Sequence, residues 1–279
     1  TEGLVGSEMC IRDSFKNKHS IKSFNKESLD IGNFSLVEDM IEGEKPNIII
    51  NAAAYTSVDK AEYNAEKAFY INSKAVKNIA INLESIKGYL IHFSTDYVFD
   101  GLKNEPYSEN DKPSPINIYG KSKLEGEINI QENMGNYFII RTSWVIGTYG
   151  NNFAKTIFRL IKEKENLNVV NDQFGVPTST TLISNITEMI ISNIKNSNHL
   201  MPGIYNLSPK GKTTWYQIAK NILSKLIKEK LIQNSPQIKI NPIETVNYHS
   251  AAKRPRNSLL NSEKICLLYT SPSPRDLRL

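Results

Sequence analysis

Short apolar runs alternate with longer amphipathic stretches through most of the chain, a pattern typical of strands and helices that follow one another around a parallel sheet. The first clear run covers residues 47–51 (NIIIN), between Pro46 and a turn of small residues, and predicts a buried strand. Residues 59–83 then carry small and apolar side chains at helical spacing. The pattern therefore predicts a strand, a loop and a helix in that order.

The same alternation continues through the rest of the chain. Further strands are expected at residues 89–94, 137–143, 167–170 and 204–207, and further helices from about Tyr119 and at residues 151–164, 182–194 and 214–228. The polar, proline-rich stretch 100–115 predicts a long loop between a strand and a helix. The expected fold class is α/β, a Rossmann-like doubly wound parallel sheet with a smaller C-terminal lobe.

Composition narrows the classes of function that fit this pattern. The 279 residues are 39% hydrophobic and 23% charged, and no apolar run approaches the ~20 residues that a membrane helix needs. The net charge of +5 is spread along the chain, which suits an anionic small ligand better than a nucleic acid. Cys10 and Cys266 are the only cysteines, so we expect no disulfide framework, thiol nucleophile or zinc site.

The strongest chemical signal is a tyrosine and a lysine four residues apart at the start of a predicted helix. Tyr119 and Lys123 would share one helix face, where the ammonium favours the phenolate and so lowers the pKa of the tyrosine. Such a tyrosine can act as a general acid near neutral pH. Chance and the polarity of a solvated helix also produce this spacing, so the pair alone is a weak signal.

A second signal precedes this helix. Thr95 follows the apolar run 89–94, which places its hydroxyl at the carboxyl end of a strand, where open α/β sheets bind ligands. A hydroxyl there can hydrogen-bond a substrate carbonyl, although a Ser-Thr-Asp cluster can also simply cap a turn. A strand that ends in Ser or Thr, followed by a loop and a Tyr-x-x-x-Lys helix, is the arrangement of the short-chain dehydrogenases.

Several linked motifs make this likeness more specific. They are NAAAYT at 51–56, VDKAE at 58–62, STDYVFDG at 94–101, YGKSKLEGE at 119–127, RTSWV at 141–145, GNNFAK at 150–155 and NDQFGVPT at 171–178. Together the motifs resemble the dTDP-4-dehydrorhamnose reductases of the extended short-chain dehydrogenase/reductase superfamily. The likeness runs from about Leu29 to Lys264. A sugar-nucleotide reductase of neighbouring specificity could share many of these motifs.

The resemblance implies a reaction and roles for its groups. The expected activity is reduction of the C4 keto group of dTDP-4-dehydro-β-L-rhamnose to dTDP-β-L-rhamnose with NADPH or NADH. By the same resemblance, Tyr119 donates the proton, Lys123 lowers its pKa and holds the nicotinamide ribose, and Thr95 orients the C4 carbonyl. We expect a cytoplasmic protein with a dTDP-sugar as its partner, no nucleic-acid or membrane partner, and a homodimer as its assembly.

The resemblance also assigns binding residues. The cofactor set is Asp30, Ile31, Ala53, Ala54, Tyr55 and Thr56, together with Tyr119 and Lys123, and the substrate set is Thr95, Asp96 and Trp144; no residue is assigned to a metal. Each assignment has a plainer alternative: a tight turn after the strand for residues 53–56, a capping carboxylate for Asp30, and a core position for Trp144.

Two further features have competing interpretations. Arg254 and Arg256 would suit an anionic pyrophosphate by bidentate pairing, but a solvated basic turn explains them equally well. His92 lies inside an apolar strand, which favours a core imidazole with satisfied hydrogen bonds over a catalytic one. The remaining histidines, His19, His199 and His249, have no helical ligand spacing.

The order of elements predicts how the chain is divided. Residues 15–175 are expected to form the NAD(P)-binding Rossmann-like domain, and residues 176–265 mainly the substrate-binding lobe. Residues 1–14 and 266–279 are expected to be non-native tails, because the first has no clear period and the second turns abruptly into Ser-Pro-Ser-Pro. An ordinary disordered terminus is the alternative.

A glycine-rich turn that would face the cofactor pyrophosphate is not found in the sequence, and we expect the first strand and this turn to be missing. The chain could then be inactive or unstable. The alternative function is a non-catalytic regulatory subunit on the same fold, like the β subunit of methionine adenosyltransferase. The presence of Thr95, Tyr119 and Lys123 favours the enzyme.

Overall fold

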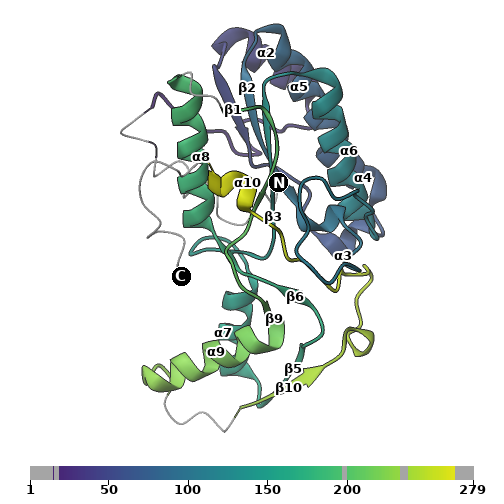
Figure 1. The fold of residues 1–279 in the computed structure, drawn as a ribbon, viewed down its shortest axis with the longest axis vertical. Helices are drawn as coiled ribbons and strands as arrows, with labels where there is room; N and C mark the ends of the chain where they lie inside the picture. The colour runs from purple at the N-terminus through teal and green to yellow at the C-terminus, as the bar shows by residue number, and fades with distance from the viewer. Residues whose placement is uncertain (1–14, 16–18, 197–199, 233–237, 268–279) are drawn as a thin grey trace.

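A four-stranded parallel sheet forms the centre of the larger part of the molecule (Figure 1). The computed structural model describes residue 15 and residues 19–196, 200–232 and 238–267. Along the sheet lie β1 (Ile48–Asn51), β2 (Tyr89–Thr95), β3 (Tyr137–Thr142) and β8 (Gly203–Leu207), each parallel to its neighbour. All four were predicted from apolar runs. Because the strands are parallel, their carboxyl ends lie at one edge, where Asn51 pairs with His92 and Thr95 with Thr142.

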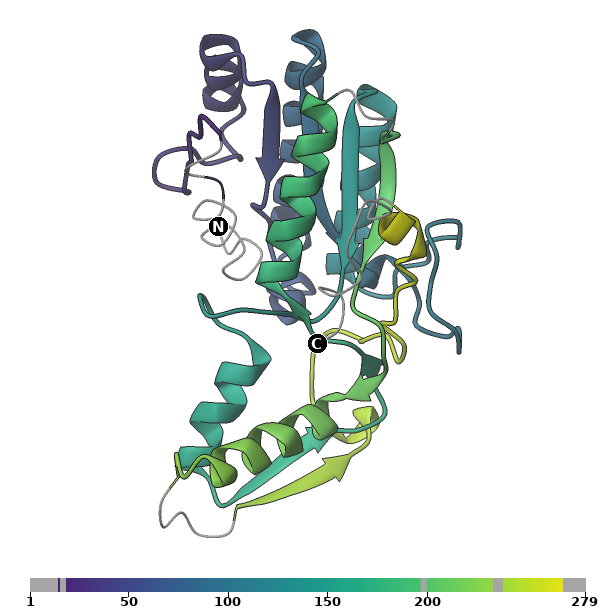
Figure 2. The same cartoon turned by 60° about the vertical axis from the view of Figure 1, so that its left-hand side comes forward.

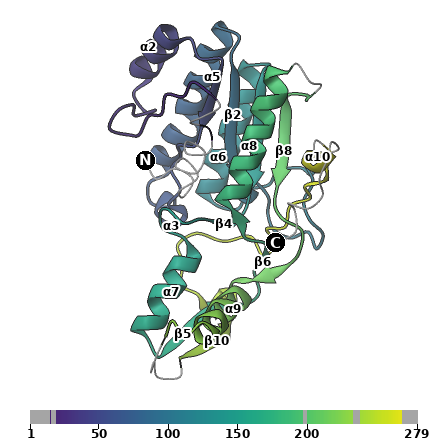
Figure 3. The same ribbon diagram turned by 90° about the vertical axis from the view of Figure 1, so that its left-hand side faces the viewer.

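Helices cover both faces of this sheet (Figure 3). The helix α8 (Thr180–Lys195) packs on the face that carries Ile91 and Phe93. The opposite face, which carries Leu90, contacts α2 (Phe34–Glu44), α5 (Ala75–Ser85) and α6 (Ile118–Asn133). Successive side chains of a strand point to opposite faces, so an uninterrupted apolar strand needs a helix on each side. The expected α/β class with a Rossmann-like parallel sheet is confirmed.

The prediction of helical structure with one continuous pattern over residues 59–83 is wrong, because the segment forms several shorter helical elements. It forms α3 (Val58–Ala61), α4 (Ala65–Phe69), the π-helical turn η1 (Tyr70–Lys74) and α5. Within the π turn, Asn72 accepts a hydrogen bond from the Tyr55 amide at 2.8 Å and donates to the Tyr55 carbonyl at 3.0 Å. The widened turn thus aims a buried amide at the loop after β1.

A smaller lobe lies below the sheet in Figure 2 and contains two helices packed on a pair of strands. The helices are α7 (Phe153–Glu163) and α9 (Trp215–Lys228), and the parallel strands are β5 (Asn166–Val170) and β10 (Lys239–Ile243). The Thr214 hydroxyl caps α9 by accepting from the Gln217 amide at 3.1 Å, as the threonine pair in the sequence predicts. The lobe has its own apolar core, formed by Ile157, Ile161, Leu167, Val169, Ala219 and Leu226.

The two parts of the molecule do not divide at residue 175 of the sequence, where the domain boundary was expected. The elements α7 and β5, which precede it, belong to the core of the smaller lobe, whereas α8 and β8, which follow it, pack in the larger part. Short pairs of strands join the two parts. They are β4 (Val145–Ile146) with β7 (Thr178–Ser179), and β6 (Phe174–Gly175) with β9 (Thr213–Thr214).

Most residues of the two expected tails lie outside the part of the chain that the structure describes. Residues 1–14 and 268–279 lie outside the described residues. Cys266, placed in the expected C-terminal tail, is the last residue of the short helix α10 (Glu263–Cys266), and its amide donates to the Ser262 carbonyl at 3.0 Å. Among the residues that the structure describes, none of the helices combines the length and apolar character required to span a bilayer.

Candidate active site

The carboxyl end of β2 brings Thr95 and Asp96 together at the edge of the sheet. The chain leaves the strand through the 3-10 turn η2 (Asp96–Val98), which Thr95 caps by accepting from the Tyr97 amide at 3.1 Å. The same hydroxyl donates to Asp96 Oδ1 at 3.1 Å. Both side chains are buried. Burial raises the pKa of Asp96 to about 6, although hydrogen bonds from Ser258 and Thr95 act in the opposite direction.

The start of α6 lies directly against this turn. Asn117 caps the helix by accepting from the Gly120 amide at 2.8 Å. A Cβ on Gly120 would lie 2.1 Å from the Tyr97 carbonyl oxygen, so a glycine is required for this close approach. The approach places Tyr119 with its ring edge-on to the ring of Tyr97, the two centroids being 5.6 Å apart.

Tyr119 does not have the lowered pKa that its spacing from Lys123 predicts. Burial raises the pKa of Tyr119 well above its usual value, and the charge of Asp96 adds to this, whereas hydrogen bonding with Thr95 lowers it. The expected effect of Lys123 is missing because its ammonium group points elsewhere. Lys123 Nζ lies 2.7 Å from the Phe93 carbonyl oxygen and 3.1 Å from His92 Nε2.

The pKa of Lys123 is also shifted from its usual value. Its side chain is buried, and burial lowers the pKa of Lys123 to about 8, with the Glu127 carboxylate opposing the change. The ammonium form still dominates at pH 7. The structure thus brings Thr95, Asp96 and Tyr119 to one place and puts Lys123 beneath them, one helical turn further along α6.

The expected cofactor residues surround a second part of the same sheet edge. Asp30, Ala54, Tyr55 and Thr56 line a cavity of about 700 Å³ beside the start of α3. Three lysines, Lys26, Lys60 and Lys67, line it too. Ala53 lies just inside, and its amide donates to Asn51 Oδ1 at 3.1 Å. Ile31 is buried in the core beneath α2 and α5.

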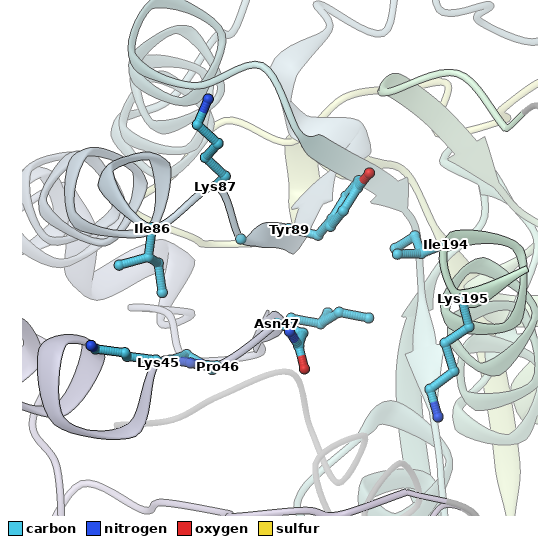
Figure 4. A pocket seen from close by; sticks show the side chains of 10 residues that line it. Lys45, Pro46, Asn47, Ile86, Lys87, Tyr89, Ile194 and Lys195 are labelled. Carbon is cyan, nitrogen blue, oxygen red and sulfur yellow. The ribbon is translucent and has the colours of Figure 1, made fainter. Parts of the chain in front are cut away.

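Asp30 does not cap a helix, the alternative interpretation: its Oδ1 accepts from the Gly32 amide at 2.9 Å in a local turn, and Asn33 is the N-cap of α2. Another cavity, of about 390 Å³, opens at the amino-terminal edge of the sheet, beside Asn47 and Tyr89 (Figure 4). In that view Lys45, Lys87 and Lys195 point in different directions rather than toward a shared centre. Of these two cavities, the one lined by Ala54–Thr56 is the larger and contains the residues expected to bind the cofactor.

Trp144 lies between the two parts of the molecule. Its backbone has a φ of 48°, a value that L residues seldom adopt, and its ring stacks on Trp215 of α9 with centroids 3.6 Å apart. A Cβ on Gly175 would come within 2.4 Å of the Trp144 ring, so this glycine makes room for it. Trp144 is partly buried, so core and site roles remain compatible.

Comparison with known proteins decides the family. The family model described as RmlD substrate binding domain matches residues 1–275. The chain belongs to this family. It is 43% identical over 237 residues to the dTDP-4-dehydrorhamnose reductase of Escherichia coli (strain K12), a match that covers 84% of this chain and 78% of that protein. The resemblance read from the linked motifs is thereby confirmed.

Solved structures of dTDP-4-dehydrorhamnose reductases have folds similar to that of this RmlD-family chain. A crystal structure of a dTDP-4-dehydrorhamnose reductase from Clostridium acetobutylicum has a TM-score of 0.84 and 35% identity, covering 94% of this chain and 88% of that one. The reductase from Bacillus anthracis str. Ames, solved in complex with NADP, has a TM-score of 0.81 and 36% identity, covering 94% and 90%.

The C-terminal arginines of this RmlD-family chain are not arranged as a pair. Arg254 donates two hydrogen bonds to Asp59 of α3, from Nη1 to Oδ1 at 3.1 Å and from Nη2 to Oδ2 at 2.6 Å. This hydrogen bonding lowers the pKa of Asp59. Arg256 is exposed. A joint pyrophosphate clamp therefore does not form in this arrangement, because the guanidinium of Arg254 already holds a carboxylate.

Sequence reasoning missed several buried polar residues around the site. His92 was expected in the core, but its contact with Lys123 was not foreseen, and neither was the contact of Asn51 with His92 at 3.1 Å. Glu127 and Arg141 form a buried ion pair beneath Lys123. An arginine inside the apolar strand 137–142, and a glutamate four residues after Lys123, were the available signals. Within the described ranges no group of three or more His, Cys, Asp or Glu side chains could hold a metal.

Proposed function

We propose that this chain is an NAD(P)H-dependent reductase that converts the C4 keto group of dTDP-4-dehydro-β-L-rhamnose to the hydroxyl of dTDP-β-L-rhamnose. The observation that carries the proposal is the meeting of Thr95 and Tyr119 at the carboxyl edge of the sheet, with Lys123 buried beneath. Membership of the RmlD family and 43% identity to a reductase of this name support it.

The residues divide the chemistry between them. NADPH or NADH, when bound, supplies a hydride to C4 of the sugar. Tyr119 gives its phenolic proton to the C4 oxygen, so that the carbonyl gains a hydride and a proton and becomes a hydroxyl. The raised pKa of Tyr119 means that the phenol carries its proton near neutral pH but is a weaker acid than a free tyrosine. Thr95 holds the carbonyl oxygen by a hydrogen bond.

The surroundings suit the cofactor at the expected loop. Small residues in Ala53–Thr56 allow a dinucleotide to approach the backbone, and the cavity of about 700 Å³ beside them offers room and three lysines for anionic groups. In this proposal Tyr119 and Lys123 also face the nicotinamide end, Asp30 and Ile31 lie toward the adenine end, and Asp96 and Trp144 contact the sugar nucleotide. A homodimer stays a prediction, which light scattering of the purified chain would check.

The test is a reductase assay on the purified chain. We expect loss of nicotinamide absorbance when NADPH and the keto sugar are mixed with it, and a fall in kcat of about 10²-fold or more for Tyr119→Phe with KM nearly unchanged. Tyr63→Phe is the control, since Tyr63 is 81% exposed. A Tyr119→Phe variant as fast as the parent would remove Tyr119 from its role. Binding of NADPH without turnover would favour a regulatory subunit.

A further inference from the structure

A buried chain of polar groups connects Lys123 to the loop after β1. Lys123 Nζ lies 3.1 Å from His92 Nε2, and His92 Nδ1 lies 3.1 Å from Asn51 Nδ2. Asn51 Oδ1 then accepts from the Ala53 amide at 3.1 Å. Lys123, His92 and Asn51 are at most 4% exposed. Each link is therefore made in a low-dielectric environment, where an unmatched donor or acceptor is costly.

The sheet itself sets this alignment. His92 follows Leu90 by two residues, so its ring points to the face of β2 that α6 covers. Asn51 is the register partner of His92 on the parallel neighbour β1. The two side chains thus lie side by side, and Lys123 of α6 reaches the ring from above the same face. A one-residue shift of either strand would separate them.

Counting donors and acceptors shows that these hydrogen-bonded groups have two mutually exclusive arrangements, one for each charge state of Lys123. The Ala53 amide can only donate, so Asn51 must present Oδ1 to it and Nδ2 to His92. His92 Nδ1 then accepts, and its proton lies on Nε2, facing Lys123. A neutral amine can accept that proton while donating to the Phe93 carbonyl. An ammonium cannot, because it has only donors.

The ammonium form requires the opposite arrangement. His92 must then accept at Nε2 and carry its proton on Nδ1, which points at the side-chain amide of Asn51. Asn51 satisfies it by turning Oδ1 toward the ring, and the Ala53 N–H loses its acceptor. We propose that His92 is a positioning residue whose tautomer couples the charge of Lys123 to the availability of the Ala53 amide.

This coupling deepens the proposed function and rests on it for its consequence. An acceptor atom of a cofactor bound at Ala53 would stabilise the turned Asn51, the Nδ1–H tautomer of His92 and the ammonium of Lys123. Cofactor binding and charging of Lys123 then favour each other, as linkage requires. The tautomer change itself needs no cofactor.

The charges around Lys123 set where the change occurs. Among the described residues, His92 faces it from β2 and Glu127 from its own helix, with Arg141 of β3 held against Glu127. From η1, Asn72 and Ser73 contact α6 through Ser122 and Glu125. The pKa of Lys123 is lowered to about 8, which places the change near that pH.

The direct test is nitrogen NMR of the chain labelled with ¹⁵N-histidine. His92→Gln identifies the signal among the four histidines. We expect Nδ1 to carry the proton at about pH 7 and Nε2 at about pH 9, on either side of the Lys123 pKa. Asn51→Asp offers only acceptors and should hold the Nδ1–H tautomer throughout. One unchanged tautomer over this range in the parent would overturn the proposal.

A matched pair of variants supplies a kinetic test. His92→Gln puts an amide near the position of Nε2 and can still accept from Lys123, whereas His92→Asn puts it near Nδ1 and cannot. We expect the basic limb of the kcat profile to move to lower pH by about one unit in His92→Asn, and to return toward the parent in His92→Gln. Equal profiles for the two variants would make His92 a packing residue and overturn the proposal.

The two proposals can fail separately. A tautomer change in a chain that neither binds NADPH nor reduces the sugar would contradict the reductase and leave the coupling intact. Reductase activity with an unchanging tautomer would do the reverse. With both intact, NADPH added at about pH 8 should raise the Nδ1–H fraction of His92, because bound cofactor favours the ammonium.

Discussion

Glu127 of α6 and Arg141 of β3 form an ion pair inside the protein, with Oε2 and Nη2 2.6 Å apart and both side chains almost fully buried. A second contact joins Arg141 Nε to Glu127 Oε1 at 3.0 Å, and the guanidinium lies over the ring of Phe99. The pair joins α6 to β3 one helical turn beyond Lys123. Removing one partner of this pair would leave the other charge buried without a counter-charge.

Glu127→Leu leaves the Arg141 guanidinium buried without its carboxylate, and we expect it to lower the free energy of unfolding by about 3–5 kcal/mol. The double variant Glu127→Leu/Arg141→Leu should recover much of this loss, because no charge then stays buried alone. Urea unfolding followed by circular dichroism measures both. Glu163→Gln breaks the exposed pair with Arg159 and should cost less than about 1 kcal/mol. A single variant as mild as this control would contradict the assignment.

Asp96 makes stability depend on pH in a definite direction. Its pKa is raised from 3.8 to about 6, so between these values the unfolded chain loses a proton that the folded protein keeps. The contribution of Asp96 is therefore complete below about pH 4 and is lost as the pH rises through about 6. The raised pKa corresponds to about 3 kcal/mol.

Asp96→Asn cannot ionise, so it isolates this effect. We expect its free energy of unfolding, relative to the parent, to rise by up to about 3 kcal/mol between pH 4 and pH 7. Denaturant unfolding of both proteins at each pH gives the difference, in which the other titrating groups cancel. A difference that stays constant, or falls, with increasing pH would show that Asp96 ionises at least as readily in the folded protein as in the unfolded chain.

The strands of the sheet were predictable because each is a short, mostly apolar run, although β2, β3 and β8 also contain His92, Arg141 and Asn206. It did not predict the π turn around Asn72, since the side chains of 59–83 keep helical spacing while the backbone hydrogen bonds change. The strand β10 was missed because Pro242 argues against a strand, although its place beside only β5 in that small sheet tolerates a proline. The short helix α2 was missed as well.

The site was predictable only as far as the motifs reach. Thr95 and Tyr119 meet because a strand end and a helix start are adjacent in this fold, which the order of motifs conveys. The direction of the Lys123 ammonium was not predictable, because it depends on the register that puts His92 beside Asn51. Helix spacing places Lys123 on the face of Tyr119 but does not say which acceptor its flexible side chain finds.

Two helical glycines should respond oppositely to the same substitution. A Cβ on Gly126 of α6 would lie 2.1 Å from the Asn72 carbonyl oxygen, so Gly126→Ala must push α6 away from η1 and should cost about 1–3 kcal/mol. Apart from its chain neighbours and its own helix backbone, nothing lies within 4 Å of the Cβ position of Gly43 in α2, and Gly43→Ala should stabilise the protein by about 0.5–1 kcal/mol. Thermal unfolding distinguishes them, and two changes of the same sign would contradict the packing described.

The stacked rings of Trp144 and Trp215 allow a test of how the two parts of the molecule meet. They are the only tryptophans in the chain, and rings 3.6 Å apart at an angle of 17° should couple strongly in near-ultraviolet circular dichroism. Trp215→Leu removes the support that holds Trp144 at its positive φ, so the coupled signal should disappear and KM for the sugar nucleotide should rise about tenfold, the equivalent of a lost aromatic pair, while kcat changes little. Trp215→Phe keeps a ring against Trp144 and should lose the signal but retain most of the affinity. A KM unchanged in Trp215→Leu would show that the stacking of Trp144 on Trp215 does not contribute to binding of the sugar nucleotide.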